Sequence, residues 1–123
     1  MKLGQLWNLR TGRVVAGQLL IADSFWNRFR GLLGRSFLLP GEGLWLKPCR
    51  RVHMMGMKFP ISVWYLDKTG HVVAIIDDLK PWKLSPRQHN TESIIEFPVG
   101  WGKATNTRLG DELIWKDYSI EQT

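Results

Sequence analysis

The run Phe59-Pro60-Ile61-Ser62-Val63-Trp64-Tyr65-Leu66 is the clearest strand signal in this chain of 123 residues. Its odd-numbered positions are all apolar, as expected when alternate side chains share one face of a strand. Trp64 and Leu66 are apolar on the opposite face, so the later half of the strand should be buried on both sides. The turn signal Asp67-Lys68-Thr69-Gly70 follows, and His71–Ile76 is expected to return beside the first strand as a hairpin.

Shorter apolar runs lie on both sides of this hairpin, and turn residues separate them. The further strands that they predict are Leu3–Leu9, Arg13–Ile21, Leu44–Lys47, Thr91–Phe97 and Leu113–Tyr118. Residues 77–90 are expected to form a long loop or irregular edge, and residues 98–106 a connection. With about eight short strands at close spacing, the pattern favours a β-sandwich or a partly closed barrel.

One helix is expected after Asp23 or Ser24, because either side chain can cap the free amide groups of a first helical turn. An apolar stripe at helical spacing follows, formed by Phe25, Phe29, Leu32 and Leu33. Gly34 ends the run, as glycine often does at a helix C-terminus. The sequence therefore predicts a mainly β fold with one short packed α-helix, in a single domain over residues 1–123.

The composition is that of a soluble globular protein, with 44% hydrophobic and 23% charged residues. A single cysteine excludes an intrachain disulfide framework. The first ten residues contain no apolar run of signal-peptide length. The longest nearly uncharged stretch, from Val14 to Ala22, is too short to span a bilayer as a helix. We therefore expect a cytoplasmic protein without a transmembrane segment.

The formal net charge of +6 is concentrated in one part of the chain. Between Ser24 and Leu66 there are seven cations and one anion, Glu42, whereas the rest of the chain holds ten of each sign. Such an excess predicts a basic surface if the segment folds compactly. The alternative is that the arginines spread around a solvated face and serve only solubility.

Residues 48–60 concentrate soft and cationic side chains. They hold the only cysteine, one of three histidines, three of four methionines and three cations. Flexible methionines beside arginines suit an anionic or partly apolar ligand. The candidate ligand-binding residues are Cys49, His53, Met55, Met57, Arg30 and Arg51. The alternative is an ordinary core role for the cysteine, the methionines and the histidine.

A soft-metal site is a second interpretation, because Cys49-x3-His53-x3-Met57 has the ligand spacing of a blue-copper loop. No histidine precedes His53 to supply the second imidazole of such a site. Residues four apart on one strand are also about 13 Å from each other, too far to share a metal. We therefore expect neither a metal nor another cofactor.

A small enzyme with Cys49 as its nucleophile is a third interpretation. Arg50 and Arg51 could lower the pKa of the thiol, and His71 or His89 could approach as a base. Nothing else in the sequence marks a nucleophile, a pair of catalytic carboxylates or a phosphate-binding glycine loop. No catalytic residue is assigned for this reason.

The order of small motifs along the chain resembles the bacterial and archaeal family called domain of unknown function 192. The resemblance is carried by Arg30-Gly31-Leu32-Leu33-Gly34-Arg35, Pro48-Cys49 through His53 and Met57, Phe59-Pro60-Ile61, Tyr65-Leu66-Asp67, Gly70, Val72-Val73, Lys80-Pro81-Trp82, Ile95-Glu96-Phe97-Pro98-Val99-Gly100 and Gly110-Asp111. It implies a compact β-rich domain of sandwich type and brings no established activity, cofactor or partner. Many relatives begin with a secretion signal, which the first ten residues do not lead us to expect here, so an extracytoplasmic location is not transferred from them. The family usually has an aspartate after the Pro-Ile pair, where this chain has Ser62.

These observations together favour a non-catalytic ligand-binding or accessory domain, with a small anionic or partly apolar ligand. Nucleic acid is not expected, because the basic segment belongs to no recognised nucleic-acid module. The ligand's identity, the oligomeric state and the pathway are left open by the sequence.

Overall fold

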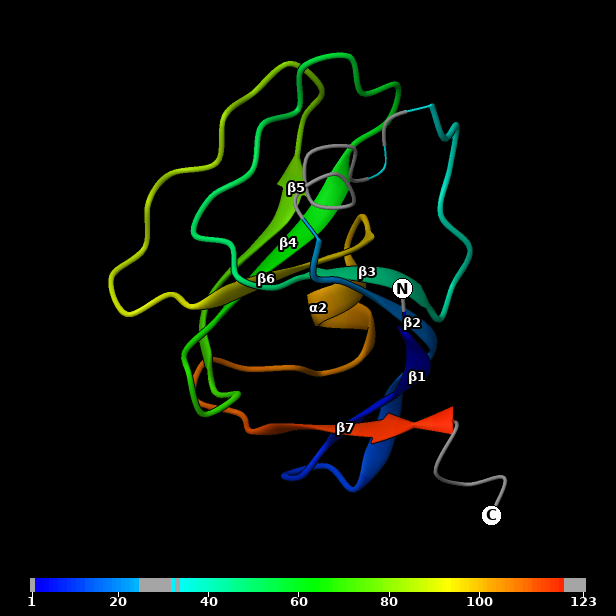
Figure 1. Ribbon diagram of the computed structural model, residues 1–123, viewed down its shortest axis with the longest axis vertical. Coiled ribbons are helices and arrows are strands. Elements are labelled where there is room, and N and C mark those ends of the chain that lie inside the picture. Colours follow the sequence, from blue (N-terminus) through cyan, green and yellow to red (C-terminus); the bar gives the residue numbers. More distant parts are fainter. Residues whose placement is uncertain (1, 25–31, 33, 119–123) are drawn as a thin grey trace.

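The computed structural model describes residues 2–24, 32 and 34–118 and places seven strands in one sheet (Figure 1). The strands are β1 (Lys2–Asn8), β2 (Arg13–Ala22), β3 (Glu42–Leu46), β4 (Ile61–Leu66), β5 (Val72–Leu79), β6 (Ser93–Pro98) and β7 (Leu113–Asp117). A four-residue helix, α2 (Trp101–Ala104), lies between β6 and β7. The expected mainly β class with a short helix is therefore confirmed.

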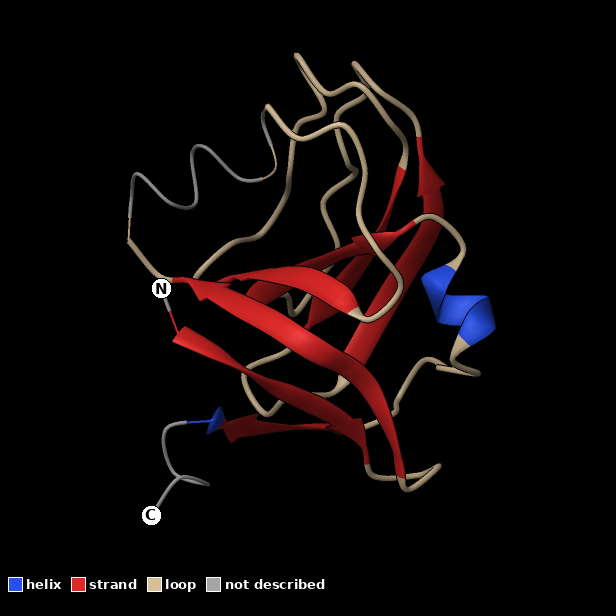
Figure 2. Ribbon diagram, turned by 90° about the vertical axis from the view of Figure 1, so that its right-hand side faces the viewer, coloured by secondary structure: helices blue, strands red, loops and turns tan. Residues whose placement is uncertain are grey.

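The sheet is mixed and curled, with the strand order β5-β4-β6-β3-β2-β1-β7. Its neighbouring strands are antiparallel except for β2 and β3, which are parallel. At one end the two edges approach, because Val72 donates its N–H to the carbonyl of Asp111 at 2.9 Å and accepts one from Gly110 at 2.7 Å. Leu113 also donates its N–H to the carbonyl of Gly70 at 3.0 Å, and His71 bridges to Glu112. Strands β5 and β7 themselves are not paired, so the sheet forms the open barrel that the strand pattern allowed (Figures 1 and 2).

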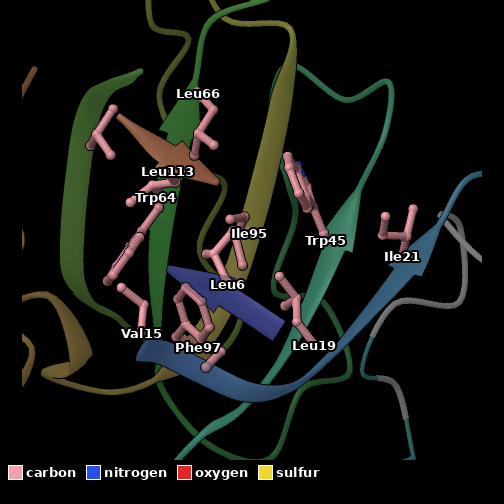
Figure 3. Packing of buried hydrophobic residues seen from close by; sticks show 12 residues of the cluster. Leu6, Val15, Leu19, Ile21, Trp45, Trp64, Leu66, Ile95, Phe97 and Leu113 are labelled. Carbon is pink, nitrogen blue, oxygen red and sulfur yellow. The ribbon is translucent and has the colours of Figure 1, made fainter. Parts of the chain in front are cut away.

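Apolar side chains pack on both faces of this sheet. The inner core fills the curl and comprises Leu6, Val15, Ala16, Leu19, Ile21, Trp45, Trp64, Leu66, Val72, Ile95, Phe97 and Leu113 (Figure 3). The outer core lies on the other face and comprises Ala22, Leu32, Leu44, Leu46, Val52, Met54, Met57, Ile61, Val63, Tyr65, Leu79 and Ile94. Strands β3, β4 and β6 contribute to both cores, so each of them is buried on two sides.

The hairpin expected from the sequence is present, with Trp64 of β4 opposite Ile75 of β5. All six residues of β4 are buried, which confirms two-sided burial and extends it to the whole strand. Strand β5 runs to Leu79, three residues beyond the expected end, because Leu79 pairs with Ile61 at the start of β4. The long loop expected from residue 77 therefore begins at Lys80.

The helix expected after Asp23 or Ser24 covers residues 25–31 and 33, which lie outside the described residues. The described helix α2 lies instead in the 98–106 segment, where only a connection was expected. Four residues are too few to produce a helical apolar period. Asp77 of β5 stabilises the start of α2, because its carboxylate accepts the N–H groups of Gly102 at 2.8 Å and Lys103 at 2.9 Å.

A buried carboxylate, Asp111, ties the β1–β2 turn to the turn before β7. It accepts hydrogen bonds from Nε of Arg10 at 2.7 Å, Nδ2 of Asn8 at 2.8 Å and the backbone N–H of Arg108 at 2.8 Å. Burial raises the pKa of Asp111, but these hydrogen bonds outweigh it and hold the pKa at about 2. The carboxylate is therefore ionised in the folded protein at neutral pH.

We expect Asp111→Ala to lower the free energy of unfolding at neutral pH by about 2 kcal/mol, because it leaves the buried amide of Asn8 and two partly buried donors without an acceptor. The matched control is Asp78→Ala, which removes an exposed carboxylate paired with Lys80 and should change it by less than about 0.5 kcal/mol. The folded pKa of about 2 lies below the ordinary pKa of an aspartate, 3.8. The gap between wild type and Asp111→Ala should therefore shrink as the pH falls from about 4 towards 2 in urea unfolding series. Equal losses in both variants would contradict this role for Asp111.

Candidate functional site

Two long loops pair with each other beyond the ends of β4 and β5. We call residues 47–60, between β3 and β4, and residues 80–91, between β5 and β6, the paired loops. The N–H of Met54 donates to the carbonyl of Lys83 and that of Trp82 to the carbonyl of Met54, both at 2.7 Å, while Ser85 donates to Val52 at 2.8 Å. Both loops extend past the strands at one end of the long axis of the molecule (Figures 1 and 2). Their backbones are therefore fixed against each other.

Burial alternates along the first of the paired loops. Val52, Met54 and Met57 are buried in the outer core, whereas His53 and Met55 are exposed. Of the two candidate methionines, Met57 is only 6% exposed and packs inward, whereas Met55 is 60% exposed. Apolar anchors thus hold the loop on the sheet and present the residues between them to solvent.

Cys49 and Arg51 lie at the base of the paired loops. Cys49 is partly buried against the outer core and donates its thiol hydrogen to the carbonyl of Arg51 at 3.3 Å. Nε of Arg51 donates to the carbonyl of Ser85 at 3.1 Å, and the hydroxyl of Tyr65 donates to that of Pro86 at 2.7 Å. Burial raises the pKa of this tyrosine. The base is therefore a hydrogen-bonded corner in which Cys49 and Arg51 serve the loop structure.

Of the remaining candidate residues, His53 faces outward and bridges to Leu84 through its backbone. Arg30 lies outside the described residues. Across residues 2–24, 32 and 34–118, no three histidine, cysteine, aspartate or glutamate side chains gather closely enough to hold a metal ion. The structure thus joins Cys49 and Arg51 by a hydrogen bond at the base, whereas Met55 is exposed to solvent.

Three exposed apolar side chains belong to the segments through which the paired loops are hydrogen-bonded to each other, and we call these three residues the tip. Trp82 is 67% exposed, Met55 is 60% exposed and Leu84 is 54% exposed. Trp82 and Leu84 were missed by the sequence reasoning, which treated residues 77–90 as an irregular connection. The signal that could have found them is the sequence Pro81-Trp82-Lys83-Leu84, where large apolar residues alternate with a cation in a segment without strand or helix periodicity.

The paired loops carry cations and no acidic residue. Their cations are Lys47, Arg50, Arg51, Lys58, Lys80, Lys83 and Arg87, and all seven are exposed. The chain has 17 cations and 11 anions, so the rest of it holds ten cations and eleven anions. The entire positive excess therefore lies on two loops that the fold joins, although they are about 20 residues apart in the sequence.

A cavity of about 610 Å³ lies where the base of the paired loops meets the β4–β5 turn. Arg50, Arg87 and His89 line it from the loops, and Asp67 and Lys68 from the turn. Asp67 already accepts hydrogen bonds from the N–H groups of Thr69 and His71, both at 2.9 Å. The lining is polar and of mixed sign, so the cavity selects an anion less strongly than the loops do.

A second feature that the sequence reasoning missed is the buried Glu96 of β6. It pairs with Leu44 of β3 and Val63 of β4, and its side chain is on the outer-core face with theirs. It is 4% exposed, and its Oε1 has no hydrogen-bond partner. Burial raises the pKa of Glu96 to about 7. The sequence signal that could have found Glu96 is its position as the one charged residue within an apolar strand.

Ser62 stands where the resemblance leads one to expect an aspartate, and it is fully buried in β4. Its hydroxyl donates to Oδ1 of Asp77 at 2.6 Å and accepts the indole N–H of Trp64 at 2.8 Å. Asp77 in turn holds the start of α2. The serine therefore satisfies a buried indole and orients a structural carboxylate.

Comparison with known proteins identifies relatives along most of the chain. The family model DUF192, described as "Uncharacterized ACR", matches residues 8–115. A UPF0127 protein of Thermococcus sibiricus is 36% identical over 121 residues, covering 90% of this chain and 74% of that protein. A UPF0127 protein of Pyrococcus furiosus is 31% identical over 114 residues, covering 88% and 95%.

Two crystal structures share the fold. A "putative transcription regulator" from Sinorhizobium meliloti superposes with a TM-score of 0.80 at 18% identity, covering 93% of this chain and 92% of that one. A protein of unknown function from Novosphingobium aromaticivorans has a TM-score of 0.75 at 17% identity, covering 92% and 84%. At these identities the likeness shows the fold alone.

The buried carboxyl of Glu96 should make stability depend on pH. Its folded pKa of about 7 lies above the ordinary pKa of a glutamate, 4.5, so between these two pH values the folded protein retains a proton that the unfolded chain has lost. The free energy of unfolding should fall by about 3 kcal/mol as the pH rises through this window. The uncharged Glu96→Gln should lack this decrease in urea unfolding at about pH 5 and about pH 8. An equal decrease in both proteins would show that other groups cause it.

Proposed function

The chain belongs to the DUF192 family, and we propose that it is a non-catalytic ligand-binding domain whose paired loops bind an anionic ligand with an apolar part. The observation that carries the proposal is the joining of seven exposed cations and three exposed apolar side chains on two loops without an acid. Folding requires such loop positions to be polar or solvated, but it does not require one sign of charge. Seven cations without an acid would attract and orient a partner of negative charge.

In this proposal the apolar and the polar part of the ligand contact different side chains of the paired loops. Met55, Trp82 and Leu84 offer the apolar contact, and Lys83 lies between two of them in the sequence. His53, exposed beside Leu84, supplies a ring that can donate a hydrogen bond to an anion. Cys49, Arg51 and Met57 support the site from the base and the core. No helix among the described residues is long and apolar enough to cross a membrane, and the cytoplasmic location remains a prediction.

Dodecyl phosphate below its micelle concentration is a suitable probe, because it joins one phosphate to one apolar chain. We expect calorimetric titration to show binding that Lys83→Glu weakens about tenfold, since reversing one charge removes an attraction and adds a repulsion. Trp82→Ala and His53→Ala should also weaken binding. All three side chains are exposed, so the free energy of unfolding should change by less than about 0.5 kcal/mol.

Arg13→Glu is the matched control, because it makes the same charge change at an exposed position at the start of β2, beside the β1–β2 turn and away from the paired loops (Figure 1). It should leave the affinity for dodecyl phosphate within about twofold of wild type. Equal weakening by Arg13→Glu and Lys83→Glu would show attraction to the overall charge and contradict a site on the paired loops. Loss of stability in His53→Ala would assign that residue to the core instead.

The alternative function, an enzyme with Cys49 as nucleophile, makes a different prediction for the thiol. In the non-catalytic proposal Cys49 is a partly buried loop residue bound to the carbonyl of Arg51. It should therefore react with iodoacetamide no faster than a small free thiol, whose pKa is about 8.5. Mass spectrometry of alkylation over a pH series tests this. Fast alkylation well below pH 8.5 would contradict the proposal and favour the enzyme.

A further inference from the structure

Resting on the ligand-binding function proposed above, we infer that the partner of the paired loops is the surface of a lipid bilayer that contains anionic headgroups. In this arrangement the three exposed apolar residues of the tip enter the bilayer to a similar depth. It is carried by the position of the tip, the kind of side chain at its end and the charge around it.

The tip is placed so that a flat surface can reach it. In two perpendicular views the paired loops form one end of the molecule, beyond β4 and β5, while the β1–β2 turn lies towards the opposite end (Figures 1 and 2). The backbone hydrogen bonds between Met54, Trp82 and Lys83 hold both loops at that end together. A planar partner would therefore meet the tip before it met the rest of the sheet.

The side chains at the tip match the layers of a bilayer interface. Tryptophan prefers the headgroup level, where its ring is apolar and its N–H stays hydrated. Met55 and Leu84 lie beside Trp82 on the joined loops and add aliphatic surface that can enter the acyl boundary. Lys58, Lys80 and Lys83 are exposed on the same loops, where long cationic side chains can reach lipid phosphates.

The charge on the paired loops favours anionic lipids over neutral ones. Each lysine or arginine near an anionic surface strengthens binding about fivefold, and no acidic residue in these loops opposes that attraction. The nearest acids along the chain are Asp78 and Glu92, which flank the second loop, and Asp78 is paired with Lys80 at 2.7 Å. The cytoplasmic location expected from the sequence would expose the tip to the anionic leaflet of a membrane.

A nucleic acid fits these side chains less well than a bilayer. Single-stranded nucleic acid is bound by a series of aromatic rings on which successive bases stack. Among the phenylalanines, tyrosines and tryptophans of the paired loops only Trp82 is exposed, and Met55 and Leu84 are aliphatic. Aliphatic side chains offer little to a base stack but insert readily between lipid headgroups.

The test is co-sedimentation of the full chain with vesicles, using phosphatidylcholine alone and an equal mixture of phosphatidylcholine with phosphatidylglycerol. We expect binding to the mixed vesicles only, and weaker binding as salt is added. Lys83→Glu should weaken it about tenfold, as should Trp82→Ala. The matched control Arg13→Glu, beside the β1–β2 turn, should bind the mixed vesicles as wild type does.

Insertion has its own readout, because Trp82 is the one exposed tryptophan among the described residues. Bromine-labelled acyl chains should quench tryptophan fluorescence in wild type more strongly than in Trp82→Phe. The phenylalanine keeps an aromatic group at the tip, so this variant should still co-sediment with the vesicles. Equal quenching of the two bound proteins would overturn the insertion of the tip.

The outcomes separate this inference from the proposed function. Binding of dodecyl phosphate without binding of mixed vesicles would overturn the bilayer as partner and leave the ligand-binding function standing. Binding of neither probe would overturn both. Vesicle binding that Lys83→Glu and Trp82→Ala leave unchanged would overturn the paired loops as the docking surface. Binding of a single-stranded oligonucleotide but not of vesicles would overturn the bilayer and assign the surface to nucleic acid.

Discussion

Strands β4 and β6 lie in the middle of the sheet with apolar side chains on both faces, and each face needs its own cover. Neighbouring residues Trp64 and Tyr65 are both fully buried, although they point to opposite sides. Curling of the sheet covers the inner face, because β1, β2 and β7 then fold over Trp64 and Phe97. The outer face is covered by other parts of the chain, and the paired loops supply Val52, Met54 and Met57 to it. The paired loops therefore contribute buried side chains to the outer core.

This anchoring explains why the paired loops can present a defined surface. Each buried anchor fixes the residue beside it to the outside, as Met54 does for His53 and Met55. Backbone hydrogen bonds to Lys83 and Ser85 align the second loop with the first. Exposed side chains on such a frame lose little backbone freedom on binding, which lowers the entropic cost of recognition. Packing determines where these exposed side chains lie. It does not require them to be cations, so the absence of acidic residues is explained by the proposed binding.

Buried polar groups of the sheet differ in whether they have hydrogen-bond partners. The hydroxyl of Ser62 is hydrogen-bonded to both Asp77 and Trp64, and Asp77 in turn orients α2. Glu96 has no such partner on Oε1, so burial acts on its carboxyl without compensation and favours the protonated form. An apolar residue at this position would pack against Leu44 and Val63 without that penalty. Glu96 is therefore the one place in the described sheet where a buried charge works against stability at alkaline pH.

The amino-acid sequence by itself determined the strands, the β4–β5 hairpin and the two-sided burial of β4, because apolar period and turn residues are local properties of the chain. It also identified residues 48–60 as unusual, but it did not distinguish Met57 from Met55 and overlooked Trp82 and Leu84. Only the tertiary structure decided which methionine faces inward and which loop lies beside Met54. The physical reason is that burial in a loop depends on what the sheet places beneath it, and the partner of an irregular segment is set by hydrogen bonds between residues far apart in the chain. The joined surface of cations and apolar side chains exists only after those distant contacts form.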